Sequence, residues 1–304
     1  MRTIFGSMAI TTDLNIRVQS LEGFCEVSVD ILRLDEIHPA ISGNKWFKLK
    51  YNIEAATASG KNSLLTFGGP WSNHLAATAA AAMESGLSSI GIVRGEEFSQ
   101  KPTPTLERCA ATGMQLIFVS RSAYRSIQEE NTTHHFKEQF PDAWVVPEGG
   151  ANEWGRCGAG EIAQLVPANY PHVCLSVGTG TTFCGIRNAL SPTQFVHGFV
   201  PMKGGAYLRT AVSSCTDGVD PSTWDLTDRF HFGGFGRTTL QLITFMNEIY
   251  ERYRLPLDII YTAKMLAGIK QLAAEGSFDQ TPRVLCIHTG GLQGNASVAD
   301  QLCF

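Results

Sequence analysis

Short apolar runs alternate with longer amphipathic stretches along most of this chain. The short runs predict strands at 27–33, 63–67, 89–93, 114–119, 143–146, 173–177, 195–200 and 284–288. Apolar residues at helical spacing predict helices at 46–58, 72–86, 104–111, 126–140, 157–165, 181–190, 205–214, 236–254 and 261–276. This alternation is typical of parallel sheets with right-handed crossovers, so the pattern predicts an α/β fold.

Composition narrows the class of protein. The chain has 304 residues, 43% hydrophobic and 17% charged, which is enough for one large or two medium α/β domains with a sizeable core. The net charge is −4 and no basic run occurs, so we expect no nucleic-acid partner. No apolar run approaches a membrane span, and residues 1–9 lack the order of a signal peptide, so we expect a cytoplasmic protein without a membrane partner. The eight cysteines form no Cys-x-x-Cys pair, and no spacing of His, Asp and Glu suggests a metal site.

The turn Ser42-Gly43-Asn44-Lys45 leads directly into a predicted helix. A lysine at that point projects from a fixed backbone, and in a partly dry cleft its pKa falls because burial disfavours the ammonium. The neutral amine that results is the form that reacts with an aldehyde cofactor. A solvated lysine at a helix start is the alternative, and it would suit an isolated Gly-Asn-Lys better.

Polar loops follow several predicted strands at the edge where open parallel sheets bind ligands. Ser72 and Asn73 begin a helix, where they either cap it or bind an anion such as a carboxylate. The loop 178–182, Gly-Thr-Gly-Thr-Thr, suits a small phosphate ester, since it has no Walker lysine and no dinucleotide-type glycine spacing. Thr289 ends the last strand, where its hydroxyl could meet a ring nitrogen. Tyr261 begins a helix and could equally be a packed aromatic residue. Pyridoxal phosphate would use the lysine, the phosphate loop, the anion-binding helix start and the threonine together.

Six segments, taken in order, resemble the 1-aminocyclopropane-1-carboxylate (ACC) deaminase / D-cysteine desulfhydrase family, pyridoxal phosphate enzymes of the tryptophan-synthase-β type. They are 42–45, 72–74, 147–152, 178–182, 261–264 and 288–291. The resemblance implies fold type II, with two open twisted parallel-sheet domains and the active site in the cleft between them. It places the large cofactor-binding domain at 1–45 and 156–304, with a smaller α/β domain inserted at 46–155. The family is commonly oligomeric, so we expect a homo-oligomer, first of all a homodimer, and a small amino-acid substrate.

The resemblance also implies roles for individual residues. Lys45 would bind the cofactor aldehyde as a Schiff base, and Asn73 would meet the ring hydroxyl. Ser72 would bind the substrate carboxylate, while Tyr261 would flank the cofactor and take part in proton transfer. The phosphate would be held by Gly178, Thr179, Gly180, Thr181 and Thr182, with Lys48. His74 and Phe235 would complete the substrate site, and Thr289 the cofactor site.

Three positions bear on the choice of activity within the family. Thr262 stands where ACC deaminases typically have a glutamate that keeps the pyridine nitrogen protonated, and His74 stands where they tend to have glutamine. A weaker electron sink favours expulsion of a thiol over opening of a cyclopropane ring. The sequence does not decide whether Thr262 or Thr289 contacts the ring nitrogen. Phe235 stands where the family usually has a second tyrosine, and it lacks that hydroxyl.

We therefore expect a D-cysteine desulfhydrase-like lyase that releases pyruvate, sulfide and ammonia by β-elimination. The alternative is an ACC deaminase or a lyase for another D-amino acid. A pyridoxal phosphate-binding protein with little catalysis is a more remote alternative, suggested by Phe235.

Overall fold

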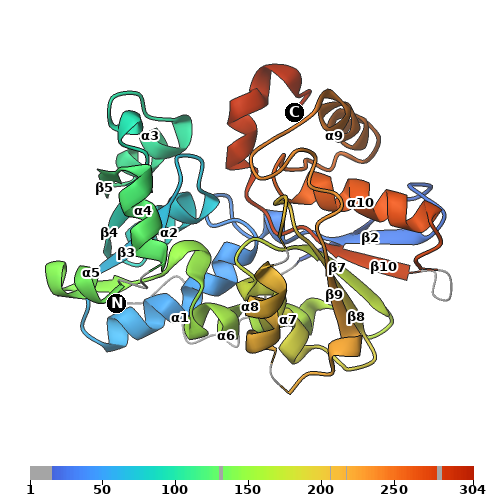
Figure 1. Ribbon diagram of the computed structural model, residues 1–304, viewed down its shortest axis with the longest axis horizontal. Helices are drawn as coiled ribbons and strands as arrows, with labels where there is room; N and C mark the ends of the chain where they lie inside the picture. Colours follow the sequence, from blue (N-terminus) through green and yellow to red (C-terminus); the bar gives the residue numbers. More distant parts are fainter. Residues whose placement is uncertain (1–15, 130–132, 206, 217, 279–282) are drawn as a thin grey trace.

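The computed structural model describes residues 16–129, 133–205, 207–216, 218–278 and 283–304, and its strands form two separate sheets (Figure 1). One sheet has the strand order β1-β2-β10-β7-β8-β9, and the other has the order β5-β4-β3-β6. The strands are β1 (Val18–Ser20), β2 (Ser28–Leu32), β3 (Ser63–Gly68), β4 (Ser88–Arg94), β5 (Met114–Val119), β6 (Ala143–Val145), β7 (His172–Ser176), β8 (Phe195–Phe199), β9 (Trp224–Thr227) and β10 (Arg283–Ile287). All pairs are parallel except β1 with β2, which is antiparallel. The predicted parallel α/β fold is confirmed, with β1 as its antiparallel edge.

Helices cover both sheets (Figure 1). They are α1 (Asn44–Ala58), α2 (Asn73–Glu84), α3 (Pro104–Ala111), α4 (Arg121–Glu129), α5 (Thr133–Gln139), α6 (Glu153–Gly160), α7 (Thr181–Ala189), α8 (Tyr207–Cys215), α9 (Leu240–Tyr253) and α10 (Thr262–Ala274). The six-stranded sheet is buried on both faces. On β7, Cys174 belongs to the apolar cluster that contains α9 and α10, whereas Val173 and Leu175 belong to the cluster that contains α7 and α8. Burial on both faces explains why these strands are continuous apolar runs.

The four-stranded sheet is packed in the same way. Leu64 on β3 packs with α1 and α2, whereas Leu65 and Phe67 pack with α4 and α5. All strands of this sheet lie between residues 63 and 145, and all strands of the larger sheet lie outside that segment. The domain limits at 45 and 155 stay predictions.

Several elements differ from the sequence expectations. The single helix expected at 126–140 is wrong, because two helices, α4 and α5, occupy this region; residues 130–132 lie outside the described residues. The helix expected at 157–165 begins earlier, as α6, and continues as a 3₁₀ helix at Glu161–Leu165. The helix expected from 236 begins at Leu240, where Thr239 caps it by accepting from the Leu242 amide. The edge strands β1 and β9 and the 3₁₀ segment Leu292–Gln301 were not expected.

No helix in the described part of the chain is long and apolar enough to cross a membrane. All eight cysteines are free thiols.

Helix α1 starts next to the segment that follows β10, where the Asn44 amide donates to the Thr289 carbonyl, and it packs closely on α6. A Cβ atom added to Gly158 of α6 would lie only 1.9 Å from the carbonyl oxygen of Phe47 on α1. The two helix backbones therefore approach each other more closely than any side chain at residue 158 would allow. Because α1 carries Lys45 and Lys48, this contact also fixes the position of both lysines.

We predict that Gly158→Ala destabilises the protein by about 1–3 kcal/mol, as overpacking of a close contact does. Gly160→Ala in the same helix is the matched control, because its added Cβ would meet its nearest atom at an ordinary 3.4 Å. That variant should be neutral or more stable by up to about 1 kcal/mol, since alanine favours helix. Urea unfolding of both variants measures the difference, and equal free energies of unfolding would contradict the prediction.

Candidate active site

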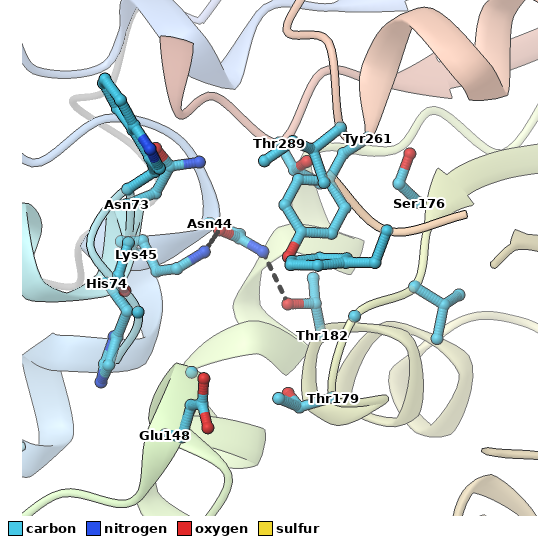
Figure 2. A pocket seen from close by; sticks show the side chains of 18 of the residues that line it. Asn44, Lys45, Asn73, His74, Glu148, Ser176, Thr179, Thr182, Tyr261 and Thr289 are labelled. Atoms are coloured by element: carbon cyan, nitrogen blue, oxygen red, sulfur yellow. Dashed lines mark hydrogen bonds between the residues drawn. The ribbon is translucent and has the colours of Figure 1, made fainter. Parts of the chain in front are cut away.

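Nearly all the predicted site residues line one cavity of about 350 Å³ at the carboxyl ends of both sheets (Figure 2). From the sequence predictions, the lining includes Lys45, Lys48, Ser72, Asn73, His74, Gly178, Thr179, Gly180, Thr182, Phe235, Tyr261 and Thr289. Thr181 is the exception. It is buried behind the cavity, and its hydroxyl lies 2.9 Å from that of Thr179. The structure therefore brings together side chains from α1, α2 and α7 with others that lie just before α10 and just after β10.

Asn44 connects the lysine turn to the rest of the site. Its backbone amide donates to the Thr289 carbonyl at 3.1 Å, and its side-chain amide donates to the Thr182 hydroxyl at 2.8 Å. Its side-chain oxygen accepts from Lys45 Nζ at 2.8 Å, and Figure 2 shows both side-chain bonds. Gly43, at φ +68°, allows this approach, because a Cβ there would lie 1.9 Å from the Thr289 carbonyl oxygen. Asn44 belongs to the predicted lysine turn, but its sequence context predicts no role for it.

The Lys45 amine has the lowered pKa that the sequence predicted. Burial lowers the pKa to about 8, and the negative charge of Asp258 partly offsets the burial. Burial and the charge of Lys45 also lower the pKa of Lys48, whose Nζ donates to the Gly149 carbonyl at 2.8 Å. Burial and both lysines lower the pKa of His74 as well. All three groups are therefore easier to deprotonate in this cavity than they are in water.

The loop before α7 forms an anion cradle. Gly180 adopts φ +82°, and the first turn of α7 follows it with its free backbone N–H groups. Gly149, which follows β6 of the four-stranded sheet, lies so close to this loop that a Cβ added at residue 149 would be 2.8 Å from the Thr179 side chain. The hydroxyls of Thr179 and Thr182 add donors at the cavity wall.

The start of α2 supports both interpretations of Ser72. Its Oγ accepts from the Leu75 amide at 3.2 Å, so it caps the helix, and it also lines the cavity. Gly291 packs directly against the Asn73 side chain, because a Cβ added at residue 291 would lie 2.3 Å from Asn73 Nδ2. The Asn73 Oδ1 atom is buried and has no hydrogen-bond partner within the described residues.

Ser176, at the end of β7, lines the same cavity and was not predicted. Its buried Oγ also has no partner among the residues that the structure describes. Unpaired buried polar atoms, a lysine amine and an anion cradle around one cavity fit a polar ring that carries an aldehyde and a phosphate.

Thr262 does not reach the cavity. Its hydroxyl donates to Asp258 at 2.8 Å and accepts from the Asp258 backbone amide at 2.8 Å. The Asp258 carboxylate in turn accepts the backbone N–H groups of Ile260, Tyr261 and Thr262 at the start of α10. Thr289 lies on the cavity wall instead (Figure 2), so of the two threonines it is the one placed to meet a ligand.

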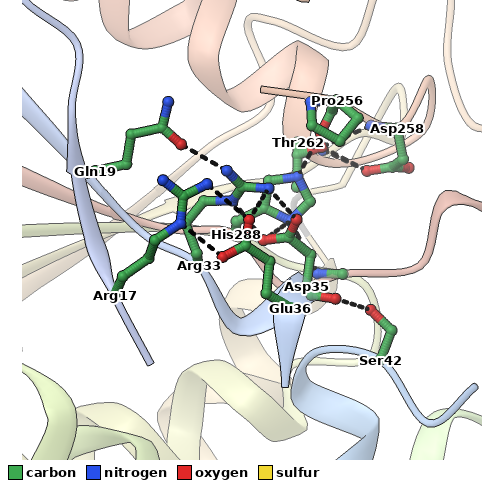
Figure 3. A network of polar contacts seen from close by, with 11 residues as sticks. Arg17, Gln19, Arg33, Asp35, Glu36, Ser42, Pro256, Asp258, Thr262 and His288 are labelled. Carbon is green, nitrogen blue, oxygen red and sulfur yellow. Dashed lines mark hydrogen bonds and ion pairs between the residues drawn. The ribbon is translucent and has the colours of Figure 1, made fainter. Parts of the chain in front are cut away.

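A polar network surrounds His288, the residue before Thr289 (Figure 3). His288 Nε2 lies 2.8 Å from the Pro256 carbonyl, and Nδ1 accepts from the Gly290 amide at 3.2 Å. Asp35 lies 3.4 Å from His288 and accepts two bonds from Arg33, at 2.9 and 2.7 Å. Burial raises the pKa of Asp35, but His288 and Arg33 outweigh it, so the net pKa is lowered and the carboxylate stays charged. The end of β10 and the segment that leads to Lys45 are thus tied together.

Tyr261 and Phe235 lie side by side on the cavity wall. Their rings meet edge to face with centroids 6.1 Å apart, and Phe235 is 48% exposed. Burial, with a contribution from Asp258, raises the pKa of Tyr261, so its hydroxyl keeps its proton. A Cβ on Gly178 would lie 3.3 Å from this hydroxyl, which places it against the cradle loop.

The known proteins that this chain resembles use the kind of cofactor that the cavity fits. Residues 14–290 match the family model described as "Pyridoxal-phosphate dependent enzyme", so the chain belongs to this family of enzymes. Within that family, the predicted resemblance to the ACC deaminase / D-cysteine desulfhydrase group is confirmed.

Two curated relatives and one crystal structure show the degree of similarity. The bifunctional D-cysteine desulfhydrase/ACC deaminase of Arabidopsis thaliana, a mitochondrial protein, is 27% identical over 291 residues, covering 86% of this chain and 72% of the relative. The D-cysteine desulfhydrase of Serratia proteamaculans is 26% identical over 291 residues, covering 86% of each chain. The crystal structure of an ACC deaminase homologue superposes with a TM-score of 0.81 at 25% identity, covering 94% of this chain and 92% of the other.

We predict that, in cofactor-free protein, acylation of Lys45 rises with pH around a midpoint of about 8, because burial lowers the pKa of its amine. Peptide mass spectrometry across a pH series measures the extent of acylation at Lys45 alone. Free Nα-acetyl-lysine in the same reaction is the control, since its side-chain amine titrates near the ordinary value of about 10.4. The same midpoint for the two amines would show that Lys45 is fully hydrated.

Proposed function

We propose that this chain is a D-cysteine desulfhydrase-like lyase that releases pyruvate, sulfide and ammonia from its substrate by β-elimination. The observation that carries the proposal is the hydroxyl of Thr289, together with that of Ser176, at the strand ends that face the cavity. Within the described residues, the only carboxylate that lines the cavity is Glu148, which belongs to the loop after β6. Hydroxyls supply no negative charge to hold a ring nitrogen protonated, and this favours a reaction with a good leaving group.

Pyridoxal phosphate, when bound, supplies an aldehyde that captures amines and a ring that accepts electrons from the α-carbon. We assign its attachment to Lys45 and its phosphate to Gly178, Thr179, Gly180 and Thr182, with Lys48 close by and Thr181 supporting Thr179.

The remaining roles follow from charge and position. The N-terminus of α2, with Ser72 and Asn73, would bind the substrate carboxylate. The Lys45 amine, with its lowered pKa, would remove the α-proton. Tyr261, which keeps its proton and lies beside the loop before α7, would hold or donate a proton. His74, in its neutral form, would line the substrate pocket.

The first test is to incubate the cofactor-loaded protein with D-cysteine, L-cysteine and ACC and to measure sulfide and keto acid. We predict sulfide and pyruvate from D-cysteine, and loss of at least about 10³-fold in rate for Lys45→Ala, since the proton-transfer group is removed. Keto acid from ACC instead would support the deaminase alternative. Bound cofactor without turnover of any of the three would support the non-catalytic binding alternative. Full activity of Lys45→Ala would contradict the proposal.

Phe235 offers a second test. We predict that Phe235→Tyr raises the rate of D-cysteine turnover by about 10-fold or more, because it returns a hydroxyl beside Tyr261 that can move a proton. Phe235→Leu is the control, since it alters the ring contact without adding a hydroxyl. Steady-state kinetics on both variants decide between the two effects. A Tyr variant no faster than wild type would show that position 235 does not transfer a proton.

The predicted homo-oligomer, with a homodimer first, and the cytoplasmic location stay predictions. Sedimentation of the purified protein tests the former.

A further inference from the structure

Three charged residues outside the predicted set line the cavity. Arg94 ends strand β4, Arg121 begins helix α4 after β5, and Glu148 follows β6. All three come from the smaller sheet, opposite the Thr289 side of the cavity. The strand order β5-β4-β3-β6 places the arginines on one side of the loop that follows β3 and Glu148 on the other.

The two arginines differ in their partners. Arg121 pairs with Glu97 at 2.6 Å, and both side chains are mostly exposed. Arg94 is partly buried, and no carboxylate in the described part of the chain lies within ion-pairing distance of it. Its guanidinium lies 5.7 Å from the centre of the buried Tyr124 ring, and Nη2 would be 3.3 Å from a Cβ on Gly69. The ring holds the guanidinium in place, while its N–H donors stay available in the plane.

The α-carboxylate of an amino acid already has a site at the start of α2, and the cofactor phosphate has one at the start of α7. A held guanidinium without a counterion is therefore an additional anion site in the same cavity. An arginine at such a place binds carboxylates and related oxyanions through two parallel hydrogen bonds.

We propose that Arg94 binds a second acidic group on the substrate, at or beyond its β-carbon, so that the preferred substrates are amino acids with an anionic side chain. This inference rests on the proposed function for the reaction at the α- and β-carbons and adds the substrate class. D-Cysteine is then an accepted substrate that leaves the Arg94 site unfilled.

Pairs of amino acids with nearly equal shape but different charge test the proposal. They have no leaving group at the β-carbon, so they bind without undergoing β-elimination. Aspartate with asparagine, and glutamate with glutamine, differ in one charge at nearly equal shape. Titration of the cofactor-loaded protein with both enantiomers, followed by calorimetry and by the cofactor absorption band, gives the dissociation constants. We expect the acidic member of at least one pair to bind about 10–100-fold more tightly, as one charge-assisted hydrogen-bonded pair provides.

The variant Arg94→Gln should remove this preference while the affinity for the neutral members changes by less than about threefold, within the scatter of a distant polar change. Arg121→Gln is the matched control on the same wall, and it should keep most of the preference because Glu97 already neutralises Arg121. Arg108→Gln on the exposed face of α3 controls for net charge and should leave every constant unchanged.

Two results would overturn the proposal. Equal affinities for the acidic and neutral members in the wild-type protein would exclude an anion site for the side chain. Equal weakening of both members by Arg94→Gln would show that Arg94 binds the α-carboxylate instead. The fate of D-cysteine separates this inference from the proposed function, because sulfide release tests the lyase reaction and the isosteric pairs test Arg94 alone.

Discussion

The site depends on the contact between the Gly43-Asn44 turn and the end of β10. Asn44 holds three parts of the chain at once, through Thr289, Thr182 and Lys45, and Gly43 removes the Cβ that would prevent the contact. The polar contacts around Asp35 and His288 hold the same two segments. Because the hydrogen bonds are buried, each is costly to leave unmade, so the lysine has one position relative to the anion cradle. A reactive amine on a flexible turn would lose this orientation.

The sequence predicted the larger part of the fold because strands buried on both faces are continuous apolar runs, as on β7 and β3. It failed where the signal is short or mixed. Strands β1 and β9 have three and four residues at sheet edges, with partly exposed side chains and no apolar run. The expected helix at 126–140 joined α4 and α5, because helical periodicity does not show where one helix ends and the next begins.

The residues that line the cavity were predictable where they sit in loops after strands, and less so where neighbours in sequence point in different directions. Thr262 follows Tyr261 directly, yet one faces Asp258 in the interior and the other faces the cavity. Thr181 and Thr182 diverge in the same way at the start of α7. Ser176 and Arg94 had no motif around them. Their signal was position alone, as the last residues of strands whose carboxyl ends face the cavity.

Burial is the main cause of the lowered pKa values in the cavity, and neighbouring positive charges add to it at two positions. Lys45 further lowers the pKa of Lys48, and both lysines further lower the pKa of His74. Arg94 adds a further positive charge to the cavity wall. Within the described residues, Glu148 is the only acid on the wall, and Asp258 acts on Lys45 from outside the lining. In the proposed function, a phosphate at the start of α7 and a carboxylate at the start of α2 would supply the further negative charge. Bound anions would offset the repulsion among these groups, so the charges that disfavour one another would favour anionic ligands.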